Sequence, residues 1–293
     1  MIPEPDAAAG RRPRTRLLVA VPAALFAVAI VTTLVRHPDG VVVSSDPGYA
    51  PRPVLLLLIP SVLAVGLTLA LPRGAGASRV VPRRPRRLRA ETAGLLLVAL
   101  GFPALVPFLP LPEDYVLVKA VLFILVPLTA LGLLARRGGP SLTIEQPSPR
   151  WWVPLLPAVL LGVTSTVGPL SQGAPPAWPP LAPLLVAAVA TALTAGFGEE
   201  LLYRRLLQTR LEAWCGPTAG LLWASLLFGL MHATSHGDGP LWADALQAIT
   251  LQGTTGLALG LIWRRWRRLE ACVLGHVLLN GFAVLVHLVG LVV

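Results

Sequence analysis

The sequence predicts an all-α fold, a polytopic bundle of transmembrane helices with about eight to nine spans. Of the 293 residues, 55% are hydrophobic and only 13% are charged, whereas an ordinary soluble domain carries about 25% charged residues. The mean hydropathy is +0.71. The hydrophobic residues form continuous runs rather than the alternating pattern of a β-barrel. The only cysteines, Cys215 and Cys272, exclude a disulfide-rich scaffold.

Nine hydrophobic runs have about the length of a membrane span, for which roughly 20 helical residues are needed. They cover residues 17–35, 54–71, 93–109, 116–134, 151–167, 181–198, 217–232, 243–263 and 271–293. The first run follows several arginines, as in a signal peptide, but it is longer than the apolar core of one and is predicted to be a retained anchor. Residues 1–16 are then an Arg-rich cytoplasmic tail, and residues 17–180 an N-terminal transmembrane region of about five spans.

The basic residues are distributed as the positive-inside rule requires. The net charge of +10 would suit a nucleic-acid partner, but the arginines form short clusters between apolar runs, and we expect no nucleic acid to bind. With the N-terminus in the cytoplasm, 21 of the 24 basic residues lie on the cytoplasmic side, with seven in the loop 73–89. The sequence therefore predicts a multi-pass protein of the cell membrane, surrounded by lipid, with its C-terminus outside. Seven of the eight Trp lie near span ends, as in an interfacial belt.

Ionisable side chains gather within the predicted spans of the last third of the chain. Earlier spans hold little polar chemistry apart from Lys119, near one span end. Ionisable groups inside a membrane are costly, and by default they mark a functional site that faces the interior of the bundle. The segments GFGEELLYRR, FGLMH and GHVLLN supply Glu199, Glu200, Arg204, His232, His276 and Asn280.

Helical spacing pairs several of these side chains. Glu200 and Arg204 are four residues apart with the acid first, the favourable order for an ion pair. Phe228 precedes His232 by the same interval, so its ring can pack on the imidazole and orient it.

His276 and Asn280 are four residues apart in HVLLN, so they share one helix face. Two such donors can reach one oxygen atom, as an oxyanion hole requires.

Glu199 and His232 can meet only if the sixth helix continues beyond its apolar run. Residues 199–213 contain good helix formers and no breaker before Gly216. If this segment is helical, Glu199 lies 15 residues before the turn at 214–216 and His232 lies 16 residues after it. Both are then level, roughly 20 Å from that turn, in antiparallel helices. The resulting depth hints at access from the Arg-rich, cytoplasmic side.

The three segments resemble the motifs of the CPBP family, the bacterial and archaeal relatives of the type II CAAX prenyl endopeptidases (Abi-type). Those motifs are two glutamates with an arginine at the fifth position after the first, a phenylalanine with a histidine four residues later, and a histidine with an asparagine four residues later. GEELLYR, FGLMH and HVLLN meet all three in the same order. The resemblance covers approximately residues 183–290 and predicts a CPBP-like catalytic transmembrane domain over residues 181–293.

The resemblance implies an intramembrane endopeptidase that cleaves a membrane-embedded or membrane-associated peptide or protein. By position in the motifs, Glu199, helped by His232, would activate a water molecule as general base. His276 and Asn280 would stabilise the tetrahedral oxyanion. No cofactor is expected. Two histidines and a carboxylate are also a catalytic zinc set, so a divalent metal such as zinc on Glu199, His232 and His276 is the less favoured alternative.

By the same resemblance, Glu200, Arg204 and Phe228 would support the site, by holding the architecture or by lying near the substrate.

Two other functions would use the same polar residues. A non-catalytic membrane module, comparable to an immunity protein, would bind a peptide or protein partner. A small proton-coupled transporter would use the charges as an ion path, although the sequence shows no repeated halves. The substrate stays open among a signal-peptide remnant, a peptide precursor and a membrane regulator.

Overall fold

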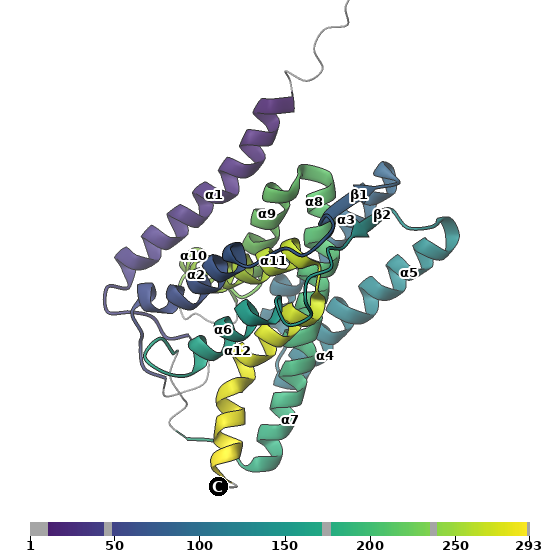
Figure 1. Cartoon of the computed structure of the whole chain (residues 1–293). Coiled ribbons are helices and arrows are strands. Elements are labelled where there is room, and N and C mark those ends of the chain that lie inside the picture. The colour runs from purple at the N-terminus through teal and green to yellow at the C-terminus, as the bar shows by residue number, and fades with distance from the viewer. Residues whose placement is uncertain (1–10, 44–48, 172–176, 235–238, 292–293) are drawn as a thin grey trace, which may run out of the picture.

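The computed structural model describes residues 11–43, 49–171, 177–234 and 239–291, and helices make up most of this part of the chain (Figure 1). Within it, six helices are long and apolar enough to cross a membrane, and three shorter apolar helices, Val54–Ala70, Leu155–Thr166 and Pro217–Leu230, accompany them. Each of the nine predicted runs falls on one of these helices. The mostly helical fold agrees with the predicted all-α bundle.

The helices follow the chain in two groups. The first comprises α1 (Arg11–Arg36), α2 (Val54–Ala70), α3 (Pro85–Leu105) with the short η1 (Val106–Phe108), α4 (Pro112–Ala120) continuing through η2 (Val121–Leu125) into α5 (Val126–Gly138), and α6 (Leu155–Thr166). The second comprises α7 (Leu181–Thr191) continuing through η3 (Ala192–Gln208) into α8 (Thr209–Cys215), α9 (Pro217–Leu230), α10 (Leu241–Ala248) continuing through η4 (Ile249–Gly253) into α11 (Thr254–Trp266), and α12 (Leu269–Gly290). Because α1 begins at Arg11, the end of the predicted tail is helical.

The sixth predicted helix continues well past residue 198, as required for Glu199 to meet His232. It runs without a break over Leu181–Cys215, 35 residues. Its middle segment, η3, is a π-helix of 17 residues, whose hydrogen bonds join residues five apart and widen the turn. π-helical turns are rare and occur frequently at functional sites. The helix stops at Gly216, whose φ of 92° suits a residue without a side chain.

The structure contains a short β-ribbon that the sequence, which indicates only a loop at 73–89, does not predict. Strand β1 (Arg79–Pro82) pairs antiparallel with β2 (Leu142–Glu145). Arg79 lies opposite Glu145 in the register of the two strands. Three residues after β1, α3 begins. The Arg-rich segment is therefore held in place against the second half of the N-terminal region.

Several arginine-bearing segments meet at one end of the bundle, which we call the Arg-rich end (71–84, 138–150, 209–216 and 264–268). Ser78 Oγ donates to the Arg264 carbonyl oxygen at 2.5 Å. The Trp266 indole donates to the Pro72 carbonyl oxygen at 3.0 Å. These contacts tie the segment after α2 to the end of α11.

The opposite helix ends form the Arg-poor end, which comprises the described parts of 37–53, 106–111, 166–180 and 231–240. The Arg36 guanidinium carbon lies 4.9 Å from the ring centroid of Trp242, so the end of α1 meets the start of α10. Trp178 stacks on His287 with ring centroids 4.4 Å apart, which joins the segment before α7 to the last turns of α12.

Two tryptophans expected in the interfacial belt are buried instead. Trp263 and Trp266 are 1% and 0% exposed. They belong to a core cluster with Leu259 and Ile262, and the Trp263 indole donates to Thr209 Oγ1 at 3.1 Å. They fill the interior beside the Arg-rich end, where an ordinary belt residue would face lipid.

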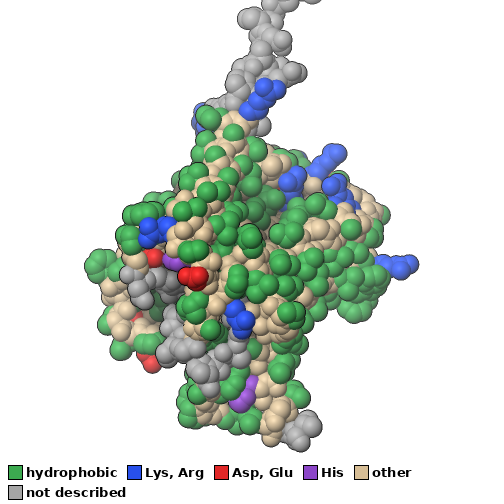
Figure 2. Space-filling view, turned by 90° about the vertical axis from the view of Figure 1, so that its left-hand side faces the viewer, with side chains coloured by type: hydrophobic (Ala, Val, Ile, Leu, Met, Phe, Trp, Pro, Cys, Tyr) green, Lys and Arg blue, Asp and Glu red, His purple; other side chains and the backbone are tan. Residues whose placement is uncertain are grey.

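The outward surface of the bundle is apolar. Figure 2 shows hydrophobic side chains over most of the face that it draws. The large hydrophobic side chains of α1 that are exposed recur at helical spacing, at Leu17, Val21, Leu25, Val28, Val31 and Val35. An exposed apolar stripe of this length fits contact with lipid.

Candidate active site

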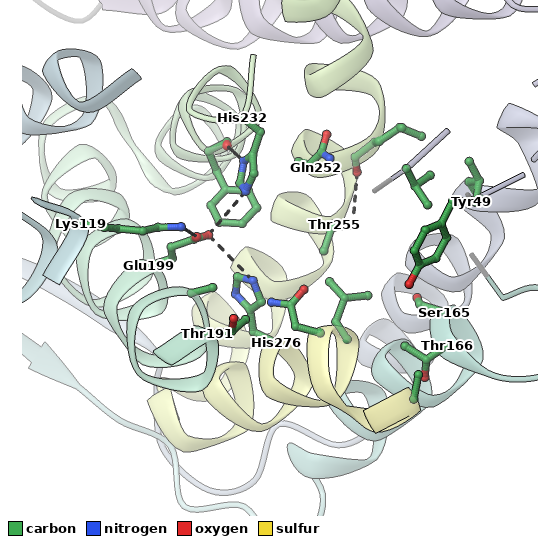
Figure 3. A pocket seen from close by; sticks show the side chains of 18 of the residues that line it. Tyr49, Lys119, Ser165, Thr166, Thr191, Glu199, His232, Gln252, Thr255 and His276 are labelled. Carbon is green, nitrogen blue, oxygen red and sulfur yellow. Dashed lines mark hydrogen bonds and ion pairs between the residues drawn. The ribbon is translucent and has the colours of Figure 1, made fainter. Parts of the chain in front are cut away.

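Glu199 lies in η3 and is 1% exposed. Its partner is Lys119, whose Nζ lies 2.5 Å from Glu199 Oε1 (Figure 3). Lys119 comes from the end of α4, is 3% exposed and donates to the hydroxyl of Tyr115 at 3.1 Å. Opposite charges in contact offset part of the cost of taking each of them out of water. The sequence signalled Lys119 only as a lone charge near a span end.

The second carboxylate oxygen of Glu199 faces two imidazoles. Oε2 lies 3.8 Å from His232 Nε2 and 3.9 Å from His276 Nε2, as Figure 3 shows. Both separations are too long for a direct hydrogen bond, and one bridging water molecule spans such a gap. His232 Nδ1 lies 2.9 Å from the Phe228 carbonyl oxygen. A carbonyl only accepts, so Nδ1 is the donor, and in the neutral ring Nε2 presents a lone pair toward Glu199.

Glu200 contacts two of the predicted site residues. Its Oε2 lies 3.2 Å from Arg204 Nε, which is the ion pair expected from the spacing. Its Oε1 accepts a hydrogen bond from His276 Nδ1 at 2.8 Å, a contact that spacing along the chain could not indicate. Glu200 and Arg204 are 0% and 1% exposed. Glu200 therefore fixes the orientation of His276, with Nε2 turned toward Glu199.

Phe228 lies at the centre of the polar residues. Its ring centroid is 5.1 Å from that of His232 and 5.9 Å from that of His276. The Arg204 guanidinium carbon lies 4.2 Å from the same centroid, in cation–π contact. The expected packing on His232 is present, and the same ring also contacts His276 and Arg204.

A cavity of ≈ 380 Å³ contains Glu199, His232 and His276 in its wall. Asn280, one turn after His276, lines the same cavity with an exposed side chain. Hydroxyl and amide groups cover much of the remaining wall, as Figure 3 shows, at Tyr49, Ser165, Thr166, Thr191, Gln252 and Thr255. All four predicted catalytic residues are therefore brought to one cavity.

A second cavity of ≈ 450 Å³ lies between α7 and α12. It shares four lining residues with the first, namely Tyr49, Thr191, Asn280 and Ala283. Most of its remaining wall is apolar, with small residues prominent, including Ala187, Ala188, Ala192 and Gly281. The two cavities are therefore neighbours, one polar at the carboxylate and one apolar beside it.

The zinc alternative does not fit these side chains. Among the described residues, no group of three or more His, Cys, Asp or Glu side chains is placed to hold a metal ion. Glu199 already contacts the Lys119 ammonium through Oε1. A second cation on this carboxylate would face that ammonium at close range, where like charges repel strongly.

Residues 181–282 match the family described as Type II CAAX prenyl endopeptidase Rce1-like. Comparison with curated proteins and with solved structures found no match. Proteins of this family are metal-independent glutamyl proteases. The matched range includes Glu199, His232, His276 and Asn280, but it begins at residue 181, after Lys119, and so does not contain that residue. The chain thus carries, over residues 181–282, an Rce1-like type II CAAX prenyl endopeptidase domain of the CPBP family.

Proposed function

We propose that the chain is an intramembrane endopeptidase that hydrolyses a membrane-embedded or membrane-associated peptide with a water molecule activated by Glu199. One observation carries this proposal above the others. Glu199 Oε2 lies between the Nε2 atoms of His232 and His276, at 3.8 and 3.9 Å, in the wall of a cavity large enough for a peptide segment. The match to a peptidase family supports the same function.

The nucleophile is a water molecule held between Glu199 Oε2 and His232 Nε2. Both atoms accept hydrogen bonds when the imidazole is neutral, so one water can donate to each of them. As the water oxygen attacks the scissile carbonyl carbon, one of its protons passes to Glu199. The same proton is then delivered to the leaving amine nitrogen as the C–N bond breaks, which restores the carboxylate.

The oxyanion of the tetrahedral intermediate is stabilised by His276 and Asn280. His276 donates from Nε2 when the ring also keeps the Nδ1 proton that binds Glu200, and Glu200 is then the counter-charge of the imidazolium. The Asn280 amide lies one turn further along α12 and is exposed to the same cavity. Fixed donors in a water-poor site supply a large part of the catalysis in such reactions.

The N-terminal region contributes to this site. In the proposed organisation, residues 181–293 carry the reacting groups, while residues 17–180 supply Lys119 and part of the cavity wall. Lys119 holds Oε1 of Glu199 and leaves Oε2 to face the water. No cofactor takes part, and the partner is the peptide substrate within the lipid bilayer.

The test compares peptide termini in the membranes and medium of cells that express the wild-type chain, Glu199→Gln or His276→Ala at matched levels. We expect at least one terminus to be present with the wild type and absent with both variants. Glu270→Gln is the matched control, because Glu270 is an exposed glutamate outside the cavity. If the termini are the same in all samples while Glu199→Gln keeps the cellular phenotype of the wild type, the site binds a partner without cleaving it.

A further inference from the structure

Most residues that line the catalytic cavity lie in the Arg-poor halves of their helices or in the segments that follow them. Val43 and Tyr49 belong to the segment after α1, and Leu57 lies in the first turn of α2. Tyr115 lies in the first turn of α4, and Thr166 is the last residue of α6. Each of these positions adjoins the Arg-poor end of its helix.

On the helices that carry the reacting groups, the cavity continues from those groups toward the Arg-poor end. Thr191 and Ala195 precede Glu199 on the helix that starts at the Arg-poor end. On α12, which starts at the Arg-rich end, the lining residues Asn280 and Ala283 come after His276. The cavity therefore extends from Glu199 toward the Arg-poor end, where α7 begins and α12 ends (Figure 1).

Packed side chains fill the space between Glu199 and the Arg-rich end. Immediately beyond Glu199 on η3, Tyr203 and Leu207 are both 0% exposed. Gln208, also fully buried, donates to the Gly260 carbonyl oxygen at 2.9 Å and to Glu212 Oε1 at 2.8 Å. The Arg267 guanidinium lies 2.5 Å from Glu212 Oε2. These residues, with the buried tryptophans of α11, fill the bundle between the site and the Arg-rich end.

We infer that the cavity opens to the extracytoplasmic face and that the peptide reaches Glu199 from that side. The Arg-rich end faces the cytoplasm by the positive-inside rule, and the cavity leads away from it. This inference rests on the proposed function for its substrate, and it reverses the cytoplasmic access that helix depth alone suggested. The substrate class that fits is a membrane-anchored peptide with a polar stretch outside the cell, such as the segment left after a chain has been exported.

The apolar cavity between α7 and α12 accommodates the anchored part of the same peptide. It adjoins the catalytic cavity, with which it shares Thr191 and Asn280 in its wall. A peptide whose apolar residues lie there places its next residues along the hydroxyl and amide groups near Glu199. Polar groups then meet the peptide backbone, and small apolar residues meet the hydrophobic side chains.

The test uses single cysteines in a chain with Cys215→Ala and Cys272→Ala, probed by a membrane-impermeant maleimide on intact and on permeabilised cells. Thr166→Cys and Ala283→Cys report on the cavity wall, and neither residue belongs to the proposed catalytic set. Ala50→Cys and Ala77→Cys are exposed controls at the Arg-poor and Arg-rich ends. We expect Ala50→Cys and at least one cavity position to react in intact cells, and Ala77→Cys to react only after permeabilisation.

Cavity cysteines that react only after permeabilisation, or only with a permeant maleimide, overturn the inference. Reaction of Ala77→Cys in intact cells overturns it as well. Labelling needs no catalysis, so it is read separately from the peptide termini. Extracytoplasmic labelling with termini unaffected by Glu199→Gln keeps the access route and removes the peptidase. Labelling from the cytoplasmic side, together with termini that are lost in Glu199→Gln, keeps the peptidase and removes the extracytoplasmic access route.

Discussion

Lys119 Nζ lies 2.5 Å from Glu199 Oε1, and the two side chains come from separate helices on either side of the family boundary at residue 181. The ammonium neutralises the carboxylate in an environment where both are almost fully buried. It also occupies one carboxylate oxygen, so the other is the one that faces His232 and His276. The geometry of the site thus depends on a residue outside the matched domain.

Removal of either member of this ion pair should destabilise the protein. Lys119→Met leaves the Glu199 charge buried without compensation, and Glu199→Gln does the same to Lys119. Breaking a buried pair by removing one partner costs about 3–5 kcal/mol. We expect both single variants to unfold at lower temperature than the wild type in detergent, as followed by circular dichroism.

The double variant Lys119→Met/Glu199→Gln should recover much of that stability, because no buried charge is left unpaired. Such coupling between the two substitutions is the signature of a direct interaction. Additive losses in the double variant would show that Lys119 and Glu199 do not interact. The double variant should stay inactive, since it lacks the proposed base.

Glu200→Gln should lower the turnover number by about 10²-fold, comparable to the loss of one oxyanion donor, because His276 loses its counter-charge. Glu212→Gln is the matched control. Both glutamates lie on the continuous helix Leu181–Cys215, are buried, and form an ion pair with an arginine. Only Glu200 also contacts His276. Both substitutions should reduce stability. Equal effects of the two on turnover, measured with a peptide found in the terminus comparison, would contradict the orienting role.

Asn280→Ala should lower turnover by about 10²–10³-fold, since it removes one donor to the oxyanion. The side chain is exposed in the cavity, so truncation should leave the unfolding temperature close to that of the wild type. Asn280→Asp is a second variant of nearly the same size that replaces the donor with an acceptor. Full activity in either variant would remove Asn280 from the mechanism.

Ala188→Trp should raise KM more than it lowers kcat, because the new ring fills part of the cavity between α7 and α12 that lies away from Glu199. Val189→Trp is the neighbouring control, since Val189 is 68% exposed on the outer surface of α7. It should leave both constants near those of the wild type. A fall in kcat without a change in KM would show that the second cavity does not bind substrate.

The sequence predicted the helices well because a membrane permits few alternatives. Backbone groups in the hydrocarbon core must be satisfied within the segment, so each apolar run is a helix. The continuation through Glu199 to Cys215 also followed from local composition, since no breaker precedes Gly216. The pairing of Glu200 with Arg204 followed from helical spacing alone.

Contacts between distant segments could not be predicted in the same way. The partner of Glu199 lies 80 positions earlier in the chain, and no periodicity links Lys119 to it. The hydrogen bond from His276 to Glu200 depends on how η3 and α12 cross. Trp263 and Trp266 lie near a span end, as belt residues do, but they face a core cluster inside the bundle and are buried. The catalytic roles of the predicted residues stay predictions until turnover is measured.

The β-ribbon also constrains the order in which the chain assembles. Val80 and Ile144 are paired across it, and α3, α4 and α5 all lie between them in sequence. The two strands can pair only when they lie on the same side of the bilayer. The outgoing helix α3 and the returning α4–α5 helix must therefore both be inserted before the ribbon forms, and the ribbon records that this helical hairpin has returned to the side it left.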